Sequence, residues 1–284
     1  MTAVARKAPE PPLGIVGALA SGFETVNARL ELILLPLALD LFLWLGPHLS
    51  IRPLAGQFAD LLRPPAGTDA VTIQNLGLLR DALAAYGASF NLFSILSTAP
   101  LGVPSLMAGR SPIAHPTGLP LSWSVDNALE YLLLVGVLVL VGLFLGALYF
   151  GGIAQQVRDA RLSLQQLLRQ VWGDWARLTA LTMIAAIGLL VFGVPTALLS
   201  VLATLVSPMV GSLVSLVGST IALWVVFYAG FTLPGIILQR RGLFGALWDS
   251  LRLVHTSLPH TAGLYGTVIL LGLGLGAVWN LPLD

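Results

Sequence analysis

The sequence predicts an all-α, polytopic integral membrane protein, and three observations carry this prediction: the composition, the long apolar segments and an internal repeat. Of the 284 residues, 56% are hydrophobic and only 10% are charged, whereas soluble domains carry roughly 25% charged residues. A helix needs about 20 mostly apolar residues to cross the hydrocarbon core. We therefore expect five transmembrane helices, which run from Leu30 to Pro47, Leu129 to Ile153, Leu178 to Val206, Leu213 to Leu238 and Gly263 to Leu281.

Basic residues set the expected orientation of these helices. Two connections between them are rich in arginine, and the link from Ser207 to Ser212 holds no basic residue. By the positive-inside rule the arginine-bearing connections are cytoplasmic, which places the N-terminus inside and the C-terminus outside. The arginines are Arg158, Arg161, Arg169 and Arg177 in the first connection and Arg240, Arg241 and Arg252 in the second.

This topology divides the chain into five parts. Residues 1–12 are expected to form a flexible cytoplasmic tail, because prolines follow its charges where a signal peptide needs an apolar core. Residues 13–47 hold an interfacial helix and the first span, and residues 48–128 form an extracytoplasmic amphipathic and Pro-rich region. Residues 129–206 and 207–284 form two transmembrane hairpin units.

The two hairpin units look alike at an offset of 79 positions: Tyr149 matches Tyr228, and Leu164 matches Leu243. Each unit consists of a span, a basic stretch, an amphipathic segment and a returning span. Apolar residues at spacings of three and four mark amphipathic helices in residues 164–178 and 244–258, and a third in residues 16–30. We interpret all three as helices in the cytoplasmic interface. The alternative is that they are the cytoplasmic ends of long helices.

The order of span, Gly-Gly, basic stretch, amphipathic segment and span is carried by LYFGGIAQQVRDARLSLQQLL and LPGIILQRRGLFGALWDSLRLV. It resembles the membrane domain of bacterial glycerophosphodiester phosphodiesterases and related uncharacterised polytopic membrane proteins. The resemblance covers the second half of the chain, from Glu130 on. It implies a multi-pass protein of the bacterial cytoplasmic (inner) membrane. The catalytic phosphodiesterase domain has no counterpart here, so the resemblance implies no catalytic residue.

Asp40 is the candidate functional polar residue, because it lies inside the apolar run LLPLALDLFLWLGPHLS. Three interpretations stay open. Asp40 is hydrogen-bonded between helices, or belongs to an ion or proton path, which is the default suspicion for a charge in a membrane, or is a solvated residue near the end of its span. Arg52 and the hydroxyl groups on later spans are its candidate partners.

The extracytoplasmic region is predicted to contain one helix and one irregular loop. Apolar residues from Leu76 to Phe93 follow a helical period. The following stretch carries five prolines between Pro100 and Pro120, which exclude regular helix and central strand. The loop is either a lid or docking surface for a partner, or an ordered covering of the helix bundle.

Basic and aromatic residues on the cytoplasmic side are candidate contacts for anionic lipid head groups. The alternative is that they determine topology and touch lipids without selecting any. The candidates are Arg158, Arg161, Arg169, Trp172, Trp175, Arg240, Arg241 and Trp248. Glycine pairs on two spans, Gly142 with Gly146 and Gly272 with Gly276, predict close helix packing through small residues.

No catalytic, metal or cofactor site is expected. The chain has no cysteine, and its four histidines are not gathered, so thiolate chemistry and a histidine metal site are not predicted. A net charge of +1 gives no case for nucleic acid binding. The leading hypothesis is a non-catalytic membrane protein that acts as a scaffold or accessory subunit, with the lipid bilayer and other membrane subunits as partners. The alternative is a lipid or small-solute transporter, or a membrane-organising protein, that uses Asp40 and the basic interface; a membrane enzyme would need a polar cluster that the sequence does not supply.

Overall fold

The computed structural model describes residues 14–64, 70–98, 100–109, 121–159 and 162–279. Several expectations fall outside these residues: the cytoplasmic tail, Arg161, the part of the Pro-rich loop in residues 110–120, and the end of the last expected span.

The described residues form an all-α protein with one small addition, a pair of parallel strands, β1 (His48–Ser50) and β2 (Ser122–Ser124). Their helices are α1 (Ile15–Ala28), α2 (Glu31–Leu45), α3 (Arg52–Leu61), α4 (Ala70–Ser89), the 3-10 helix η1 (Leu92–Ser97), α5 (Ala128–Asp159), α6 (Leu164–Val206), α7 (Pro208–Ala229), α8 (Thr232–Ile237), α9 (Leu243–Thr256) and α10 (Leu258–Trp279).

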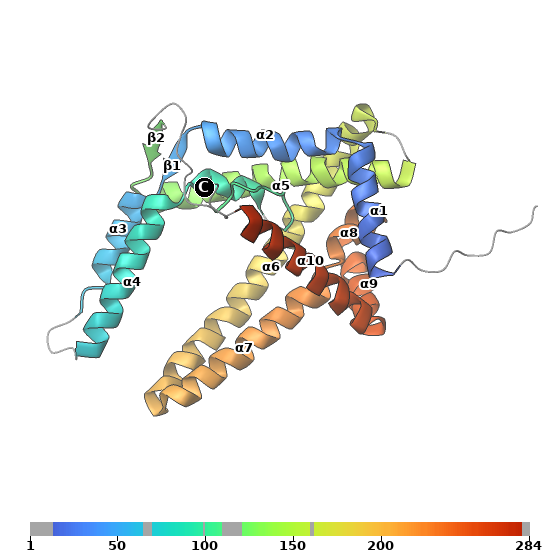
Figure 1. Ribbon diagram of the computed structural model, residues 1–284. Helices are drawn as coiled ribbons and strands as arrows, with labels where there is room; N and C mark the ends of the chain where they lie inside the picture. Colours follow the sequence, from blue (N-terminus) through green and yellow to red (C-terminus); the bar gives the residue numbers. More distant parts are fainter. Residues whose placement is uncertain (1–13, 65–69, 99, 110–120, 160–161, 280–284) are drawn as a thin grey trace, which may run out of the picture.

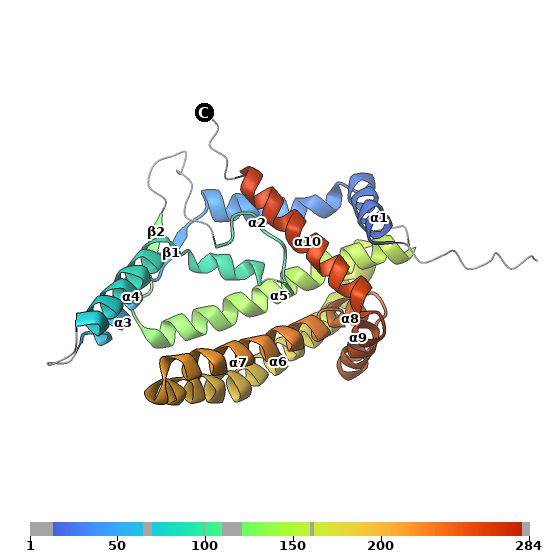
Figure 2. The ribbon, with the colours of Figure 1, turned by 60° about the horizontal axis from the view of Figure 1, so that its bottom comes forward.

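The helices form a body with two projecting hairpins (Figure 1). The helices α2 and α5 lie side by side in the body, while α6 and α7 run together as a long hairpin that leaves it. The helices α3 and α4 form a second, shorter hairpin at the left end of the body in this view. Figure 2 shows the same arrangement after rotation, with α6 and α7 still in contact along their lengths.

Within the described residues, three helices are long enough and apolar enough to cross a membrane: α5, α6, and α7 continued by α8 as Pro208–Ile237. They correspond to the second, third and fourth expected spans. The described apolar part of α10, Leu258–Gly274, is shorter. The helix α2 has 15 residues and so measures about 22 Å, less than the roughly 30 Å of a hydrocarbon core. The structure thus has three full-length candidates, and five spans stay a prediction.

The three amphipathic segments do not share one structure. The first and third are separate helices, α1 and α9, which end before α2 and α10 begin. The second is continuous with its span, because α6 runs for 43 residues from Leu164 to Val206. This segment is therefore the end of a long helix, as the alternative interpretation predicted, and not a separate interfacial helix. Pro195 lies inside α6 and does not end it.

The helix α5 is the centre of the molecule, because both hydrophobic cores are built on it. Its first half packs with α2, β1 and η1 around Leu138. Its second half packs with α6, α8 and α9 around Leu143 and Ala147. The largest fully buried apolar side chains of the two cores are Leu92, Val103 and Val125 in the first and Leu143, Val171, Leu178 and Ile236 in the second.

Two glycines of α5 allow the irregular segment after η1 to pack closely against the middle of the helix. A Cβ on Gly142 would collide with Thr98 Oγ1, and one on Gly146 would collide with the carbonyl oxygen of Leu101. The predicted close packing at this pair is therefore confirmed, but its partner is the segment after η1 and not another long helix. Irregular backbone at this depth is tolerated only where it is buried in protein and its polar groups are paired. Here Ser97 Oγ donates to the carbonyl of Val103 at 2.8 Å, and Leu101 N donates to Thr98 at 3.0 Å.

Candidate functional site

The carboxylate of Asp40 holds the segment that follows η1. One of its oxygens, Oδ1, accepts hydrogen bonds from Ser105 Oγ at 2.5 Å, Leu106 N at 2.9 Å and Met107 N at 3.2 Å. An ionised carboxylate only accepts hydrogen bonds, so three donors on one oxygen are well matched to it. Asp40 thus pairs polar groups of an irregular loop that lies against apolar helices.

The partner of Asp40 is one that the sequence did not indicate. Arg52 begins α3 after β1, and no ion pair joins it to Asp40 among the described residues. The hydroxyl that Asp40 binds belongs to Ser105, 65 positions away in the Pro-rich stretch. Asp40 is thus hydrogen-bonded to a loop and not to a neighbouring span, and its part in an ion or proton path stays a prediction.

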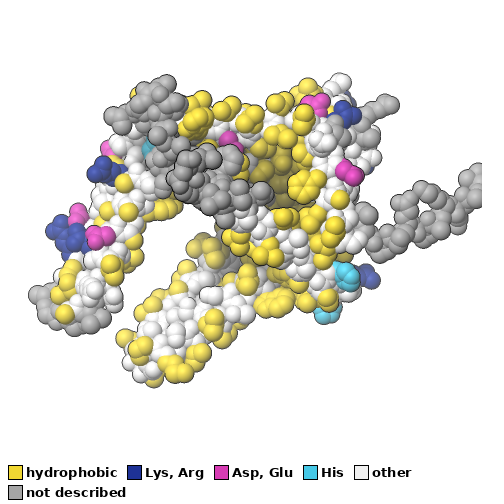
Figure 3. All heavy atoms as spheres, viewed as in Figure 1, with side chains coloured by type: hydrophobic (Ala, Val, Ile, Leu, Met, Phe, Trp, Pro, Cys, Tyr) yellow, Lys and Arg dark blue, Asp and Glu magenta, His cyan; other side chains and the backbone are white. Residues whose placement is uncertain are grey.

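A groove with a volume of about 570 Å³ leads to Asp40. Its walls come from α1 (Thr25, Val26), α2 (Leu32 to Asp40), α5 (Tyr149, Ile153, Val157) and the loop at Pro104–Leu106. Figure 3 shows a recess lined by hydrophobic side chains below α2 and beside α1. Its volume lies within the roughly 300–1,000 Å³ that is typical of small-molecule sites.

The polar groups of the groove are few. Asp40 is the only charged side chain among the described residues that line it. Three hydroxyls, those of Thr25, Ser105 and Tyr149, also belong to the lining. Ser105 donates its proton to Asp40, and Thr25 donates its proton to the carbonyl of Ser21 at 2.8 Å. The groove therefore offers apolar walls, one carboxylate and hydroxyl oxygens that accept hydrogen bonds.

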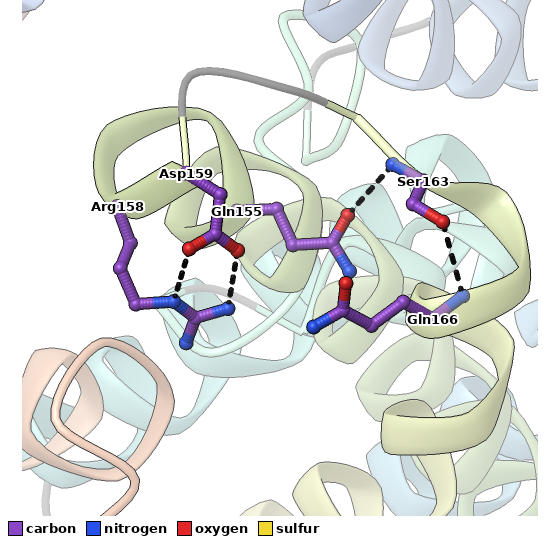
Figure 4. Close-up of polar contacts among 5 residues, drawn as sticks. All are labelled: Gln155, Arg158, Asp159, Ser163 and Gln166. Carbon is purple, nitrogen blue, oxygen red and sulfur yellow. Dashed lines mark hydrogen bonds and ion pairs between the residues drawn. The ribbon is translucent and has the colours of Figure 1, made fainter.

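The predicted basic contacts lie around the connection between α5 and α6 and the connection between α8 and α9. Arg158 makes a two-pronged ion pair with Asp159, through Nε at 2.9 Å and Nη2 at 2.8 Å (Figure 4). Beside it, Gln155 Oε1 accepts a hydrogen bond from Ser163 N at 3.0 Å, and Ser163 caps α6 (Figure 4). The carboxylate of Asp159 thus already satisfies much of the charge of Arg158.

The second connection carries Arg240 and Arg241. Arg241 Nε lies 3.4 Å from Asp249 Oδ2. Arg240 has a φ of 52°, a left-handed conformation that is uncommon for a residue other than glycine. Arg240 and Arg169 form no ion pair with another described residue, although the charge of Arg240 acts on the carboxylates of Asp159 and Asp174.

The predicted tryptophans do not share one surface. Trp172 and Trp175 pack on Phe144, with ring centroids 5.4 Å and 6.3 Å apart. The indole N–H of Trp175 donates to the carbonyl of Leu140 at 2.9 Å, so this pair lies against the middle of α5. Trp248 lies on α9 and is 68% exposed.

His48 lies outside the long helices, and the fold changes its pKa. Burial at the start of β1 lowers the pKa of His48 below its ordinary value, while a hydrogen bond with the backbone of Phe90 acts weakly in the opposite direction. Within the described part of the chain, no group of three or more His, Cys, Asp or Glu side chains is placed to hold a metal ion.

Comparison of the chain with protein-family models, with curated proteins and with solved structures finds no match. The resemblance to phosphodiesterase membrane domains stays a prediction.

Proposed function

We propose that this chain is a non-catalytic integral membrane protein that acts as a scaffold or accessory subunit of a membrane complex. In this proposal α2 and α10 join the three long helices as spans, with the N-terminus inside and the C-terminus outside. Because α2 is short, local thinning of the bilayer accommodates it. The resemblance noted above favours a bacterial cytoplasmic membrane.

The observation that carries the proposal is a set of glycines on α10 that no described residue approaches. Some glycines of the long helices already face close neighbours: Gly142 and Gly146 meet the segment after η1, and a Cβ on Gly211 or Gly218 would collide with Thr204 or Thr196 of α6. In α10, Gly266, Gly272 and Gly274 have nothing within 4 Å of the position of a Cβ. Small residues in membrane helices serve close approach of another helix.

The sides of α10 around these glycines are apolar and uncovered. Val268, Ile269 and Leu270 are 51%, 58% and 70% exposed. The helix α10 contacts α9 and α1, and Tyr265 in its first half packs on Phe227 of α7. The proposed partner is therefore a transmembrane helix of another polypeptide, which packs along the second half of α10.

The test is extraction of the tagged chain from its native membrane into nanodiscs without detergent, followed by mass measurement and mass spectrometry. We expect a particle that contains a protein partner in a fixed ratio to the 29.9 kDa chain. Gly272→Leu should release the partner, while Gly136→Leu should not, because Gly136 also has open space around it but lies on α5. A wild-type chain that is extracted alone would contradict the proposal.

The groove favours a second candidate, a protein that binds or moves a lipid or small solute. A ligand cavity that reaches Asp40 distinguishes this candidate from a purely structural subunit. Arg169 and Arg240 are the positions at which it would contact anionic lipid head groups. Enrichment of one lipid class with a chain that carries no protein partner would favour this candidate over the first.

A further inference from the structure

At the end of the groove, only one of the two carboxylate oxygens of Asp40 is hydrogen-bonded to described residues. Its Oδ1 binds the loop through three hydrogen bonds. Its Oδ2 accepts no hydrogen bond from any described residue, and no cationic side chain lines the groove in the described part of the chain. This second carboxylate oxygen can therefore accept a hydrogen bond from a donor outside the described residues. A charge in apolar surroundings carries a large desolvation free energy unless a partner pairs with it.

The rest of the groove selects an apolar partner. Leu32, Ile33 and Leu37 come from α2, and Ile153 and Val157 come from α5 on the facing wall. Such a lining favours a hydrocarbon chain, whose burial gains about 0.8 kcal/mol per CH₂ group. The ligand must combine this chain with a group that pairs with a carboxylate.

We propose that the groove binds an amphiphile that consists of an aliphatic chain and a primary ammonium group and carries no anionic group. The ammonium donates to Asp40 Oδ2, and the chain lies between α2 and α5. The hydroxyl oxygens of Thr25 and Tyr149 are further acceptors in the groove, and an ammonium has three donors. This inference does not depend on the subunit role, because it concerns α1, α2 and α5 and not α10.

The charge of the lining excludes the common anionic amphiphiles. A fatty acid or a phospholipid would bring a carboxylate or phosphate next to Asp40, with no described cation in the lining to neutralise it. Like charges close together in a site of low polarity repel strongly. An uncharged alcohol of the same length would bind through the chain alone.

The variant Asp40→Asn should abolish the ammonium contact while it keeps the hydrogen bonds that hold the loop. The amide oxygen of asparagine still accepts the hydrogen bonds of Ser105, Leu106 and Met107, while the second oxygen becomes a donor that an ammonium cannot use. Asp81→Asn is the matched control, because Asp81 is an exposed carboxylate on α4, outside the groove. Ile153→Trp fills the groove with a large side chain and leaves the charge in place.

The experiment uses the full chain in phosphatidylcholine nanodiscs and three photoreactive C16 probes with the same diazirine position: an amine, an alcohol and a carboxylic acid. Labelled peptides are quantified by mass spectrometry. We expect the amine to label peptides of α2 and α5 about tenfold more than the alcohol, the ratio that about 1.4 kcal/mol from a charge-assisted hydrogen bond provides. The acid should label least.

The variants decide the outcome. In Asp40→Asn, labelling by the amine should fall to the level of labelling by the alcohol. Asp81→Asn should leave the tenfold preference for the amine intact. Ile153→Trp should reduce labelling by all three probes. Equal labelling of the wild type by the three probes would overturn the proposal. So would an amine preference that survives in Asp40→Asn.

Discussion

The carboxylate of Asp40, in α2, accepts a hydrogen bond of 2.5 Å from the hydroxyl of Ser105, which lies in the loop after η1. The bond joins two parts of the chain that are 65 positions apart. It explains why a charged residue lies in an apolar helix: the carboxylate satisfies the donors of irregular backbone that the helix packs against.

The first prediction concerns this pairing. Asp40→Leu removes the acceptor of Ser105 Oγ and Leu106 N and leaves Met107 N with Ser105 Oγ alone, and each such hydrogen bond contributes about 0.5–1.5 kcal/mol. We expect the peptide that covers residues 104–109 to exchange its amide hydrogens at least tenfold faster, as mass spectrometry of the chain in nanodiscs would show. Asp40→Asn should stay close to the wild type. Unchanged exchange in Asp40→Leu would show that the loop is held by other contacts.

The second prediction concerns close packing at the middle of α5. Gly142→Leu places a large side chain where Thr98 and the carbonyl of Leu96 already lie. Overpacking of this kind costs typically about 1–3 kcal/mol, so we expect a lower midpoint of thermal unfolding. Gly136→Leu, on an open part of the same helix, is the control. Equal midpoints for the two variants would contradict the packing seen here.

The third prediction concerns the break between α7 and α8. The buried hydroxyl of Ser250, on α9, donates to the carbonyl of Tyr228 at 2.7 Å and accepts from Phe231 N at 3.1 Å. Ser250→Ala removes both bonds and should cost about 1–3 kcal/mol in stability to denaturant. Ser212→Ala, whose exposed hydroxyl bonds only within α7, should change little. A reversed order of the two effects would show that Ser250 does not join the helices.

The fourth prediction is a pH dependence in the region of β1. The folded protein lowers the pKa of His48 from its ordinary value of 6.5, mainly through burial. Because the unfolded form then takes up a proton more readily, the contribution of neutral His48 is present above about pH 6.5 and is lost as the pH falls below it. Tryptophan fluorescence, to which Trp123 opposite Leu49 contributes, should therefore change as the pH falls below about 6.5. His48→Gln should remove this change, and its persistence there would assign it to another group.

The length of the apolar segments predicted the long helices, because this length can be read from the local sequence. The ranges expected for the second and third spans lie within α5 and α6. The range expected for the fourth span lies within α7 continued by α8, except for its last residue, Leu238. The boundary between α9 and α10 has a local cause as well. Pro259 near the start of α10 has no N–H to donate and clashes with the preceding turn, so the helix is interrupted at Ser257.

Other features depend on contacts that the local sequence does not contain. Nothing in the segment before Leu178 breaks a helix strongly, and so the expected interfacial helix is continuous with α6. The partner of Asp40 depends on how the segment after η1 folds along α5. The helical period from Leu76 to Phe93 also overruns the structure, because α4 ends at Ser89 and Phe93 belongs to η1.

The central claim is that the segment after η1 lies against the middle of α5, where Asp40 can hold its continuation. The chain has no cysteine, so a pair of introduced cysteines reports one contact without background. The test uses the double variant Thr98→Cys/Gly142→Cys. A Cβ at position 142 lies against the position of Thr98 Oγ1, which the sulfur of a cysteine at position 98 would take. Mild oxidation in intact membranes should link this pair rapidly and leave Thr98→Cys/Gly136→Cys unlinked. Failure of the first pair to link, or equal linking of both, would contradict the account.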